Sequence, residues 1–317
     1  MLKLKMMIRK ILILVLKLVP ICFIDRIKKS YLNKSNGKFK KKLLHKILTV
    51  LRYKDISKSI EFFEVGGRIP LKLATCHSVL INQLYFFGDD GYEPLESVYW
   101  QRLCKRSKGI LELGANVGYH TIQGALANPQ ARYIAVEPHP VNVSLLKKNF
   151  KLNNITSVKI VEAAVVGKKS SDKMTLAVPV NDFQESPSGC YLADGAEAIK
   201  RVSNQLITVD VVQATELTDG IDLIKIDVEG YEYNILSSIH EYIVNNRPII
   251  FVEVLNKAEH LKQFIFELCQ KHDYKLYCFA DSGLVTVEPE HILEMNVWDE
   301  FTSRDVILAT QPLQDLP

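Results

Sequence analysis

Short apolar runs alternate with helical patterns from about residue 109 to the end of the chain. The runs GILELG, ARYIAVEP, SVKIVEAAVV, DLIKIDV and PIIFVEV predict buried strands. Helices are predicted over 116–127, 141–151, 258–272 and from Tyr231. Apolar strands that alternate with helices indicate an α/β fold, in which a parallel sheet carries helices on both faces. Two late runs, YKLYCFA and RDVILAT, predict an antiparallel hairpin at one edge of the sheet.

The chain before this pattern is predicted to form two further parts. Residues 61–108 read as a small extension, with a β-hairpin around the turn Gly66-Gly67 in a stretch of short strands over 61–87. A helix is predicted over 92–106 from its apolar spacing. The predicted organisation is therefore an N-terminal arm (1–60), the extension (61–108) and an α/β domain (109–317).

Within the α/β domain, residues 167–206 are polar and predict an irregular insertion, with weak strand content near 174–178. Loops beyond the strand ends build specificity on this architecture. We therefore expect the insertion to cap a substrate site.

Charge divides the chain unevenly. The formal net charge is +4, but residues 1–60 contain 17 basic residues and only two acidic ones, Asp25 and Asp55. The arm thus carries +15 and the remainder −11. An acidic body argues against an enzyme that grips nucleic-acid phosphates along its main surface, so no nucleic-acid partner is predicted.

The start of the arm combines lysines with apolar residues. The apolar run 11–24 is interrupted by Lys17 and is too short to span a bilayer comfortably. Lys3, Lys10 and Lys17 recur every seven residues and share one helical face. This pattern predicts a helix on an anionic membrane surface, with peripheral contact through residues 1–30. A helix packed on the main domain, a protein-binding arm and an uncleaved signal anchor are the alternatives.

The cysteines add a prediction about the compartment. The six cysteines lie far apart and form no C-x-x-C motif, which argues against zinc-ribbon and thioredoxin-like sites. Packed free thiols in a reducing compartment are favoured, so a cytoplasmic location is predicted.

A loop with two glycines, ELGANVG, follows the first strand of the α/β pattern. Gly114 permits a tight turn, and Gly118 lets the next helix approach the strand. Dinucleotide-binding loops carry glycine where Asn116 stands, so Asn116 disfavours NAD and FAD and suits a ligand without pyrophosphate. Glu112, at the strand end, is expected to meet a cationic group. A purely structural turn is the alternative.

An acidic residue, Glu137, ends the second strand, 23 residues after Gly114. Near this spacing, a carboxylate binds the two hydroxyls of a ribose in nucleotide-binding α/β domains. The loop and Glu137 together predict a nucleoside-containing ligand. An ordinary surface glutamate at a strand end is the alternative.

The run IKIDVEG places three ionisable groups in and after an apolar strand. Lys225 and Asp227 share one face, because residues i and i+2 of a strand point the same way, and Glu229 joins them if the strand persists. Such groups are costly in a buried strand unless they are paired or functional. Asp227 lies at the carboxyl end, where open α/β sheets bind ligands. A buried ion pair that holds the strand is the alternative.

Glu253 ends the adjacent strand and is expected to converge with Asp227. Two or three carboxylates could hold Mg²⁺. No further ligand set is visible in the sequence, so a polar or hydrogen-bonding role is preferred, and a divalent metal stays an open possibility.

In order and spacing, these motifs resemble those of the FkbM-type S-adenosylmethionine (SAM)-dependent methyltransferases. The resemblance extends over about 92–308 and rests on ILELGANVGYHT, VEPHPVNVSLLKKN, IDLIKIDVEGYEYNIL and IIFVEV. The family usually has Asp where this chain has Glu112, which preserves the charge. The resemblance implies the class I methyltransferase fold, a Rossmann-like sheet of seven mostly parallel strands. It also implies O-methylation of a hydroxyl on a sugar, glycan, polyketide or related metabolite.

The resemblance also implies roles for individual residues. The methionine part of SAM would be cradled by Glu112, Gly114, Asn116 and Gly118, with Tyr119 and His120 on the first turn of the following helix. Glu137, followed by Pro138, would bind the ribose hydroxyls, and Ala163 and Ala164 would border the adenine.

Methyl transfer requires an acceptor oxygen aligned with the S–CH₃ bond and a group that takes its proton. Asp227 is the expected base or hydroxyl orienter, with Glu229 and Glu253 as alternates and Lys225 tuning Asp227. His120 is a competing base. The alternative function is a non-catalytic, methyltransferase-like scaffold or membrane-associated binding protein.

Overall fold

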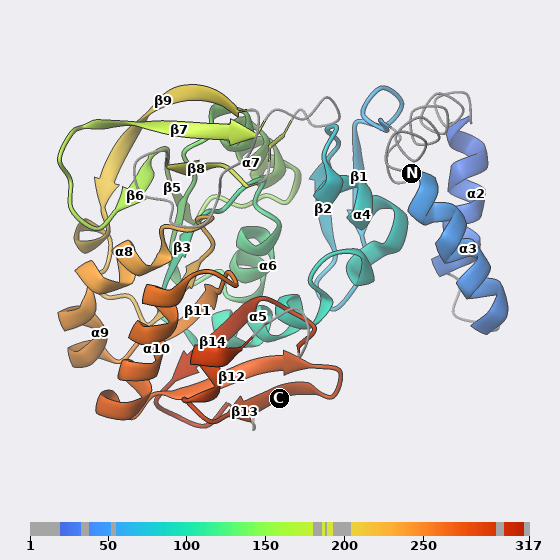
Figure 1. Cartoon of the computed structure of the whole chain (residues 1–317). Helices are drawn as coiled ribbons and strands as arrows, with labels where there is room; N and C mark the ends of the chain where they lie inside the picture. The colour runs from blue at the N-terminus through green and yellow to red at the C-terminus, as the bar shows by residue number, and fades with distance from the viewer. Residues whose placement is uncertain are drawn as a thin grey trace, which may run out of the picture. The chain divides into compact units, whose positions relative to one another are not determined.

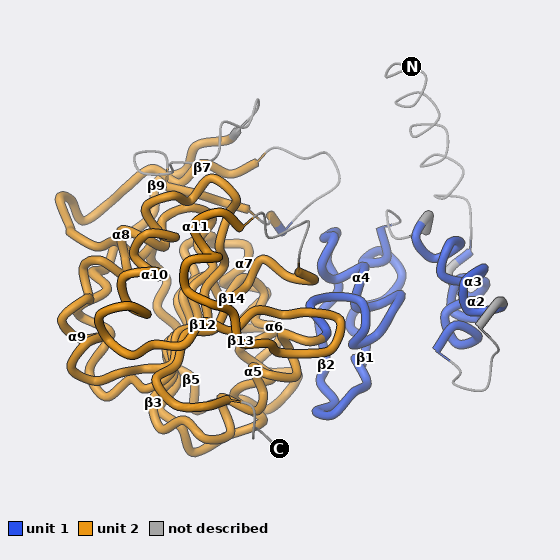
Figure 2. Tube along the Cα trace, turned by 60° about the horizontal axis from the view of Figure 1, so that its bottom comes forward, with its two compact units in different colours: residues 1–94, 181–186 blue, residues 95–180, 187–317 orange. Residues whose placement is uncertain are grey.

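The computed structural model describes residues 20–32, 38–51, 55–179, 186–187, 189–192, 204–295 and 301–313. The chain divides into two compact units, shown in Figure 2. Unit 1 contains residues 1–94 and 181–186, and unit 2 contains residues 95–180 and 187–317. The segment predicted as an extension, 61–108, is therefore shared between the units, because nearly all of helix α5 (Pro94–Arg106) belongs to unit 2.

Unit 2 is built around an eight-stranded sheet with the order β13-β12-β14-β11-β10-β3-β4-β5 (Figure 1). Its strands are β3 (Gly109–Leu113), β4 (Arg132–Val136), β5 (Val158–Val161), β10 (Leu223–Ile226), β11 (Ile249–Glu253), β12 (Lys275–Ala280), β13 (Gly283–Val287) and β14 (Asp305–Ala309). The five strands from β5 to β11 pair in parallel. β14 is antiparallel to both of its neighbours. This mostly parallel sheet confirms the predicted α/β fold.

The two late runs form β12 and β14, which pair antiparallel as predicted but are not consecutive strands of a hairpin. β14 inserts between β11 and β12, whereas the hairpin partner of β12 is β13, paired through Cys278 and Val285. β13 makes an eighth strand that the sequence did not predict. It lies at the sheet edge and most of its side chains are only partly buried, so its apolar pattern is weak.

Helices cover both faces of the sheet, as predicted (Figure 1). They are α5, α6 (Tyr119–Ala127), α7 (Pro140–Leu152), α8 (Glu232–Ser238), α9 (His240–Asn246), α10 (Glu259–His272) and α11 (His291–Glu294), with a 3-10 turn at Ala214–Glu216. One face buries Leu111, Ile224 and Ile250 in a common core with α8 and α10. On the other face, Trp100 of α5 packs edge-on against Phe251, with ring centroids 6.0 Å apart.

Strand alternation decides which face receives the charged residues. Glu112 and Lys225 are neighbours in the register of β3 and β10, and Lys225 is the neighbour of Phe251 in β11. Side chains at such paired positions point to the same face of a sheet. Glu112 and Lys225 therefore lie on the face that carries Trp100, opposite the aliphatic core.

A second, four-stranded sheet of order β6-β9-β7-β8 belongs to the same unit. It contains β6 (Ala164–Val166), β7 (Lys173–Pro179), β8 (Tyr191–Leu192) and β9 (Asn204–Gln213). The run SVKIVEAAVV, predicted as one strand, is therefore split between β5 and β6 in different sheets. The weak strand content predicted near 174–178 is confirmed by β7, but the prediction of an irregular insertion over 167–206 is wrong at β8 and at the start of β9. β8 has only two residues, and β9 alternates between exposed and buried positions over 208–211, so the apolar signal of both strands is weak.

Unit 1 contains α2 (Ile21–Leu32), α3 (Lys38–Leu51), β1 (Phe62–Val65), β2 (Leu71–Ala74), α4 (Val79–Phe87) and a 3-10 turn at Gly88–Gly91. β1 and β2 pair antiparallel, which confirms the predicted hairpin. Short strands were predicted up to residue 87, but the last part of that stretch is helix α4. Most of its apolar side chains are buried, and periodicity alone does not distinguish such a helix from a strand.

None of the described helices is both long and apolar enough to cross a membrane. Residues 1–19 lie outside the described part of the chain. The predicted amphipathic helix with Lys3, Lys10 and Lys17 therefore stays a prediction.

Candidate functional site

The loop between β3 and α6 has a backbone that requires glycine at two positions. Gly114 has φ +88° and Gly118 has φ +87°. A Cβ atom on Gly114 would lie 1.9 Å from the backbone oxygen of Asp227, and one on Gly118 would lie 2.3 Å from Leu146 Cδ1. The loop therefore packs tightly between the end of β10 and helix α7. Gly114 and Asn116 are partly exposed, so this end of the loop reaches the surface.

Glu137 holds this loop through its carboxylate. Its Oε2 accepts a hydrogen bond from the Asn116 backbone N–H at 2.8 Å. Its Oε1 accepts from the His139 N–H at 2.9 Å and from Asn142 Nδ2 at 3.2 Å. Burial raises the pKa of Glu137 to about 6, although these donors favour the ionised form. A carboxylate has about four acceptor sites, so Glu137 has room for another donor.

Glu112 lies inside the fold. The Tyr133 hydroxyl donates a hydrogen bond to Glu112 Oε2 at 2.5 Å. Burial raises the pKa of Glu112 to about 7, against the opposing effects of Tyr133 and Lys225. The cationic group beside the Glu112 carboxylate is thus Lys225 of the chain itself. The contact of Glu112 with SAM stays a prediction.

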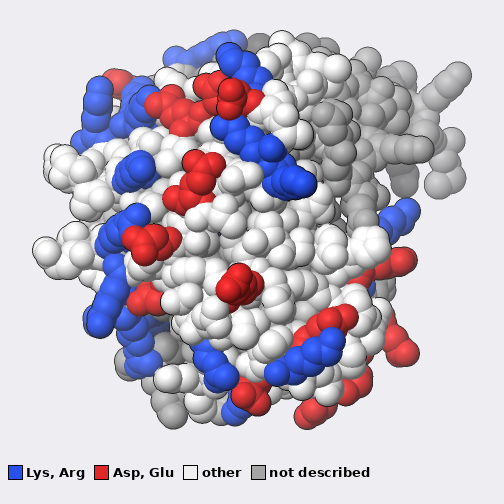
Figure 3. Space-filling model, turned by 90° about the vertical axis from the view of Figure 1, so that its left-hand side faces the viewer, with Lys and Arg blue, Asp and Glu red and all other residues white. Residues whose placement is uncertain are grey.

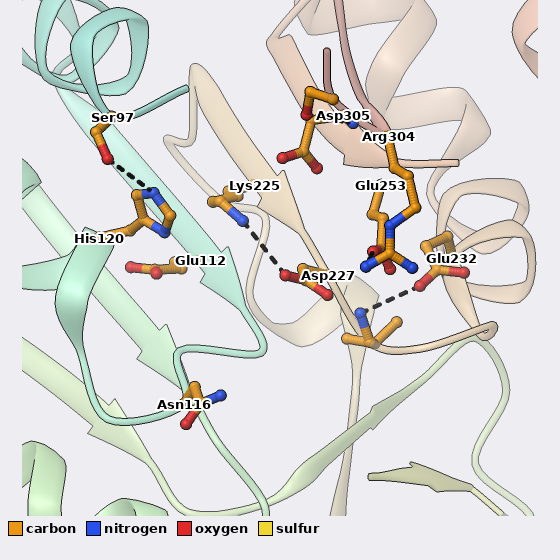
Figure 4. A network of polar contacts seen from close by, with 12 residues as sticks. Ser97, Glu112, Asn116, His120, Lys225, Asp227, Glu232, Glu253, Arg304 and Asp305 are labelled. Atoms are coloured by element: carbon orange, nitrogen blue, oxygen red, sulfur yellow. Dashed lines mark hydrogen bonds and ion pairs between the residues drawn. The ribbon is translucent and has the colours of Figure 1, made fainter. Parts of the chain in front are cut away.

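Lys225 and Asp227 come together at the carboxyl end of β10. Lys225 Nζ lies 3.7 Å from Asp227 Oδ2, and the two side chains are 3% and 28% exposed. The Asp227 N–H donates to the Leu113 carbonyl at 3.0 Å, which ties Asp227 to the glycine loop. Figure 4 shows Lys225 pointing toward Asp227, with Glu112 on its other side. The alternation predicted for Lys225 and Asp227 is therefore present in the structure.

The same alternation does not extend to Glu229. β10 ends at Ile226, and Glu229 has φ +57° in the loop that follows. Glu229 was predicted to lie on the same face as Lys225 and Asp227 only if the strand continued to residue 229. The strand ends earlier, so Glu229 does not follow this alternation. Glu229 remains partly exposed in this loop.

The loop after β10 is held by Glu232, which sequence reasoning missed. The Glu232 carboxylate accepts hydrogen bonds from the N–H groups of Val228 at 3.1 Å and Gly230 at 3.0 Å. Burial raises the pKa of Glu232 to about 7. The available signal was its position in the first turn of α8, where acidic side chains are favoured.

Glu253 reaches the same edge of the sheet from β11, as predicted (Figure 4). Its Oε1 lies 2.7 Å from Nη2 of Arg304, and its register partner is Asp305 of β14. Burial raises the pKa of Glu253 well above its ordinary range and that of Asp305 to about 6. Arg304 and Asp305 were not predicted from the sequence as site residues. Because β14 runs antiparallel to β11, it is the start of β14 that lies beside the carboxyl end of β11.

His120 is buried on the first turn of α6. Its Nε2 lies 3.5 Å from Ser97 Oγ, and its carbonyl accepts a hydrogen bond from Trp100 Nε1 at 2.9 Å. Burial and the charge of Lys225 hold the pKa of His120 well below its ordinary value, so the ring is neutral. A neutral but enclosed imidazole is a poorer candidate base than the partly exposed Asp227.

The remaining predicted residues lie around the loop. Tyr119 is buried at the start of α6, and Pro138 is partly exposed next to Glu137. Ala163 is buried between β5 and β6, beyond the carboxyl end of β5, and Ala164 begins β6. Part of the insertion that was expected to cap the site, residues 180–185, 188 and 193–203, lies outside the described residues.

The charges at this edge are predominantly acidic. The acidic side chains are Glu112, Glu137, Asp227, Glu253 and Asp305, and the basic ones are Lys225 and Arg304. Within the described ranges, no three His, Cys, Asp or Glu residues are grouped so as to hold a metal ion. Burial raises the pKa values of Glu112, Glu137, Glu253 and Asp305, and a positively charged ligand beside these groups would favour their ionised forms.

The raised pKa of Glu112 gives a testable pH dependence. Its folded value, about 7, exceeds the ordinary value of 4.5, so between them the folded state binds more protons than the unfolded state. The stability from Glu112 is thus full below pH 4.5 and is lost as the pH rises through 7. The free energy of unfolding of the wild type should fall relative to Glu112→Gln, by up to about 1.4 kcal/mol per pKa unit. Urea unfolding at both ends of this window measures it, and a difference that is independent of pH would contradict it.

Comparisons with known proteins agree with these motifs. The family described as the methyltransferase FkbM domain matches residues 112–276, which is more than half of the chain. "Methyltransferase 1" of Beauveria bassiana (strain ARSEF 2860) is 24% identical over 149 residues, which cover 42% of this chain and 58% of that protein. "Methyltransferase sdnD" of Sordaria araneosa is 28% identical over 162 residues, which cover 42% of this chain and 60% of that protein.

A solved structure, methyltransferase FkbM from Methylobacillus flagellatus KT, is 14% identical with a TM-score of 0.39, covering 84% of this chain and 60% of that chain. The matches to the two curated methyltransferases span only 58% and 60% of their lengths. The family match contains the glycine loop, Glu137, the IKIDVEG segment and Glu253 in one continuous stretch. This chain therefore belongs to the FkbM methyltransferase family.

Proposed function

We propose that the protein is a SAM-dependent methyltransferase that methylates a hydroxyl oxygen on a sugar, glycan or related metabolite. One observation carries the proposal: the partly exposed loop around Asn116 is tied to Glu137 on one side and to Asp227 on the other. A nucleoside-binding carboxylate and a candidate base thus meet at one loop. Family membership supports the reaction class, and the acceptor follows from the resemblance alone.

The residues present fit this cofactor. Glu137 has acceptor capacity left for a ribose hydroxyl, and the partly exposed residues Gly114 and Asn116 would lie against the methionine part. Ala163, just beyond the end of β5, would border the adenine. The acidic residues at the sheet edge would attract the positively charged sulfonium group of SAM. They would attract the neutral thioether of the product less strongly.

The chain's own residues would then align the acceptor and take its proton. SAM, when bound, supplies an electrophilic methyl group. The acceptor hydroxyl would be held against this methyl group, and its proton would pass to the Asp227 carboxylate. Lys225 Nζ, 3.7 Å from Asp227 Oδ2, would hold this carboxylate in place. Glu229 and Glu253 are the alternate bases.

Calorimetric titration with SAM tests the cofactor. Wild-type protein should bind, and Glu137→Gln should bind at least about tenfold more weakly, because hydrogen bonds to charged groups contribute roughly 1.5–3 kcal/mol. Glu162→Gln is the matched control, since Glu162 forms a surface ion pair with Lys147 in which the two side chains are 55% and 48% exposed. Wild-type protein that fails to bind at millimolar SAM would favour the non-catalytic scaffold.

The acceptor is tested by transfer of a labelled methyl group. Wild-type protein incubated with labelled SAM and cell extract should place the label in a methyl ether of a sugar, glycan or related metabolite. Label that appears only on protein or nucleic-acid nitrogen would contradict O-methylation.

The proposal also includes a cytoplasmic location with peripheral membrane contact through residues 1–30 and no nucleic-acid partner. The basic and apolar sequence of that segment supports the contact. Figure 3 supports the proposal that the protein has no nucleic-acid partner, for one face of the molecule. Basic and acidic side chains are interspersed over the coloured residues of that face. A nucleic-acid groove needs a continuous basic stripe.

A further inference from the structure

The two N-terminal helices of unit 1 have a defined inner side. Ile24 of α2 and Leu48 of α3 are fully buried. Tyr85 of α4 donates a hydrogen bond to Asp25, and Lys28 Nζ lies 3.8 Å from the centroid of the Tyr85 ring. Burial lowers the pKa of Lys28 to about 8. These contacts attach α2 to α4 and direct Lys28 inward.

An aromatic cluster attaches α3 to the same group. The ring of His45 lies 4.9 Å from that of Phe87 and 5.9 Å from that of Tyr31, between centroids. Tyr31 in turn packs edge-on against Phe87 at 5.6 Å. Helix α3 is therefore held by both α2 and α4, and its remaining surface is directed outward.

That outward surface, which we call the α3 face, is apolar along its centre and basic along its borders. Leu43 and Ile47 are one helical turn apart and are 52% and 38% exposed. Lys40 and Lys46 stand three residues before and after Leu43, and both are exposed, as is Lys42. On a helix, positions three and four apart are neighbours. The α3 face thus presents an aliphatic stripe bordered by ammonium groups.

The surrounding sequence supplies almost no countercharge. Between residues 20 and 51 the chain has nine basic residues and a single acidic one, Asp25, which is engaged by Tyr85. An exposed aliphatic stripe with a basic border matches an interface between acyl chains and anionic headgroups. A nucleic-acid backbone would satisfy the lysines but would leave Leu43 and Ile47 without an apolar partner.

We propose that the α3 face binds an anionic lipid surface, with Leu43 and Ile47 at the acyl boundary and the lysines at headgroup phosphates. The face lies outside residues 1–30, so it is a second membrane contact. The basic sequence of the arm already indicated that Lys40 and Lys42 would add attraction to a membrane, but the exposed stripe of Leu43 and Ile47 is seen only in the structure. The inference is independent of the proposed methyltransferase activity, since it uses only unit 1.

Sedimentation with lipid vesicles tests the proposal on the full chain. Wild-type protein should bind phosphatidylglycerol–phosphatidylcholine vesicles and bind pure phosphatidylcholine vesicles weakly. Lys40→Ala/Lys46→Ala should weaken partitioning about 30-fold, the effect expected for two lysines near an anionic surface. Leu43→Ser/Ile47→Ser should weaken it at least about tenfold. Circular dichroism confirms that each variant keeps its fold.

Matched controls come from unit 2. Leu206→Ser removes an exposed leucine from β9, where it is 64% exposed, and Lys159→Ala removes an exposed lysine from β5. Both should partition like the wild type. Equal binding to neutral and anionic vesicles, or unchanged partitioning of both α3 variants, would overturn the proposal. Binding to polyuridylate is measured alongside. If the α3 variants lost this binding while their vesicle binding was unchanged, the α3 face would be a nucleic-acid surface and the proposal would be wrong.

Discussion

Replacement of Gly114 by alanine should remove SAM binding and destabilise unit 2. The added Cβ would lie 1.9 Å from the Asp227 backbone oxygen, a backbone atom that cannot rotate away. The residue would also have to keep φ at +88°, which costs an alanine roughly 1–2 kcal/mol. With the overpacking, the free energy of unfolding should fall by about 2–5 kcal/mol. The loop must separate from β10 to relieve the contact, so its alignment with Asp227 is lost.

Gly220→Ala is the control for Gly114→Ala, because it introduces the strain of a positive φ without a close contact of the added Cβ. Gly220 also has a positive φ, +66°, but the nearest atom to its added Cβ is Nη1 of Arg132, at 3.4 Å. This variant should lose about 1 kcal/mol of stability and bind SAM normally. Urea unfolding and calorimetric titration of both variants give the comparison. If Gly114→Ala bound SAM as tightly as the wild type, the loop would not be the cofactor site.

Asp227→Asn should retain SAM binding and lose methyl transfer by about 10²–10⁴-fold, the range contributed by a positioned general base. An amide keeps the shape and the backbone contact of Asp227 with Leu113 but cannot take the hydroxyl proton. The effect should therefore appear in kcat, with the Kd for SAM changed only a few-fold. Single-turnover transfer and calorimetry measure the two quantities separately.

A control for this variant is Asp210→Asn, because Asp210 forms a solvent-exposed ion pair with Lys173 on the second sheet. It should transfer methyl groups like the wild type. Near-normal turnover of Asp227→Asn would mean that Asp227 is not the base. The same assay on Glu229→Gln and Glu253→Gln would then test the alternates. Glu253→Gln also changes the buried pair with Arg304, so its stability must be measured alongside.

The central strands and the glycine loop could be predicted because their signals are local. A buried parallel strand is apolar along most of its length, and β3, β4, β10 and β11 each have one charged residue in an otherwise apolar run. The requirement for glycine at 114 and 118 arises within one turn of chain. The position of Glu137 beside Asn116 follows from two parallel strands that end at the same edge.

The elements that were missed depend on partners distant in sequence. β9 is a half-polar strand that is stabilised by its pairing with β7, and no stretch of its own sequence indicates that partner. β14 could be recognised as a strand, but its place between β11 and β12 could not. That placement brings Arg304 to 2.7 Å from Glu253, a contact between residues about fifty positions apart.

By itself, the amino-acid sequence determined the α/β class, the family and the carboxylates at the sheet edge, because strand period and short motifs record these in neighbouring residues. Only the tertiary structure decided what those carboxylates meet. It enclosed Glu112 with Tyr133 and Lys225, ended β10 before Glu229, and supplied Arg304 and Asp305 from an antiparallel strand. The physical reason is that burial and pairing are set by the register of strands that approach one another only when the chain folds.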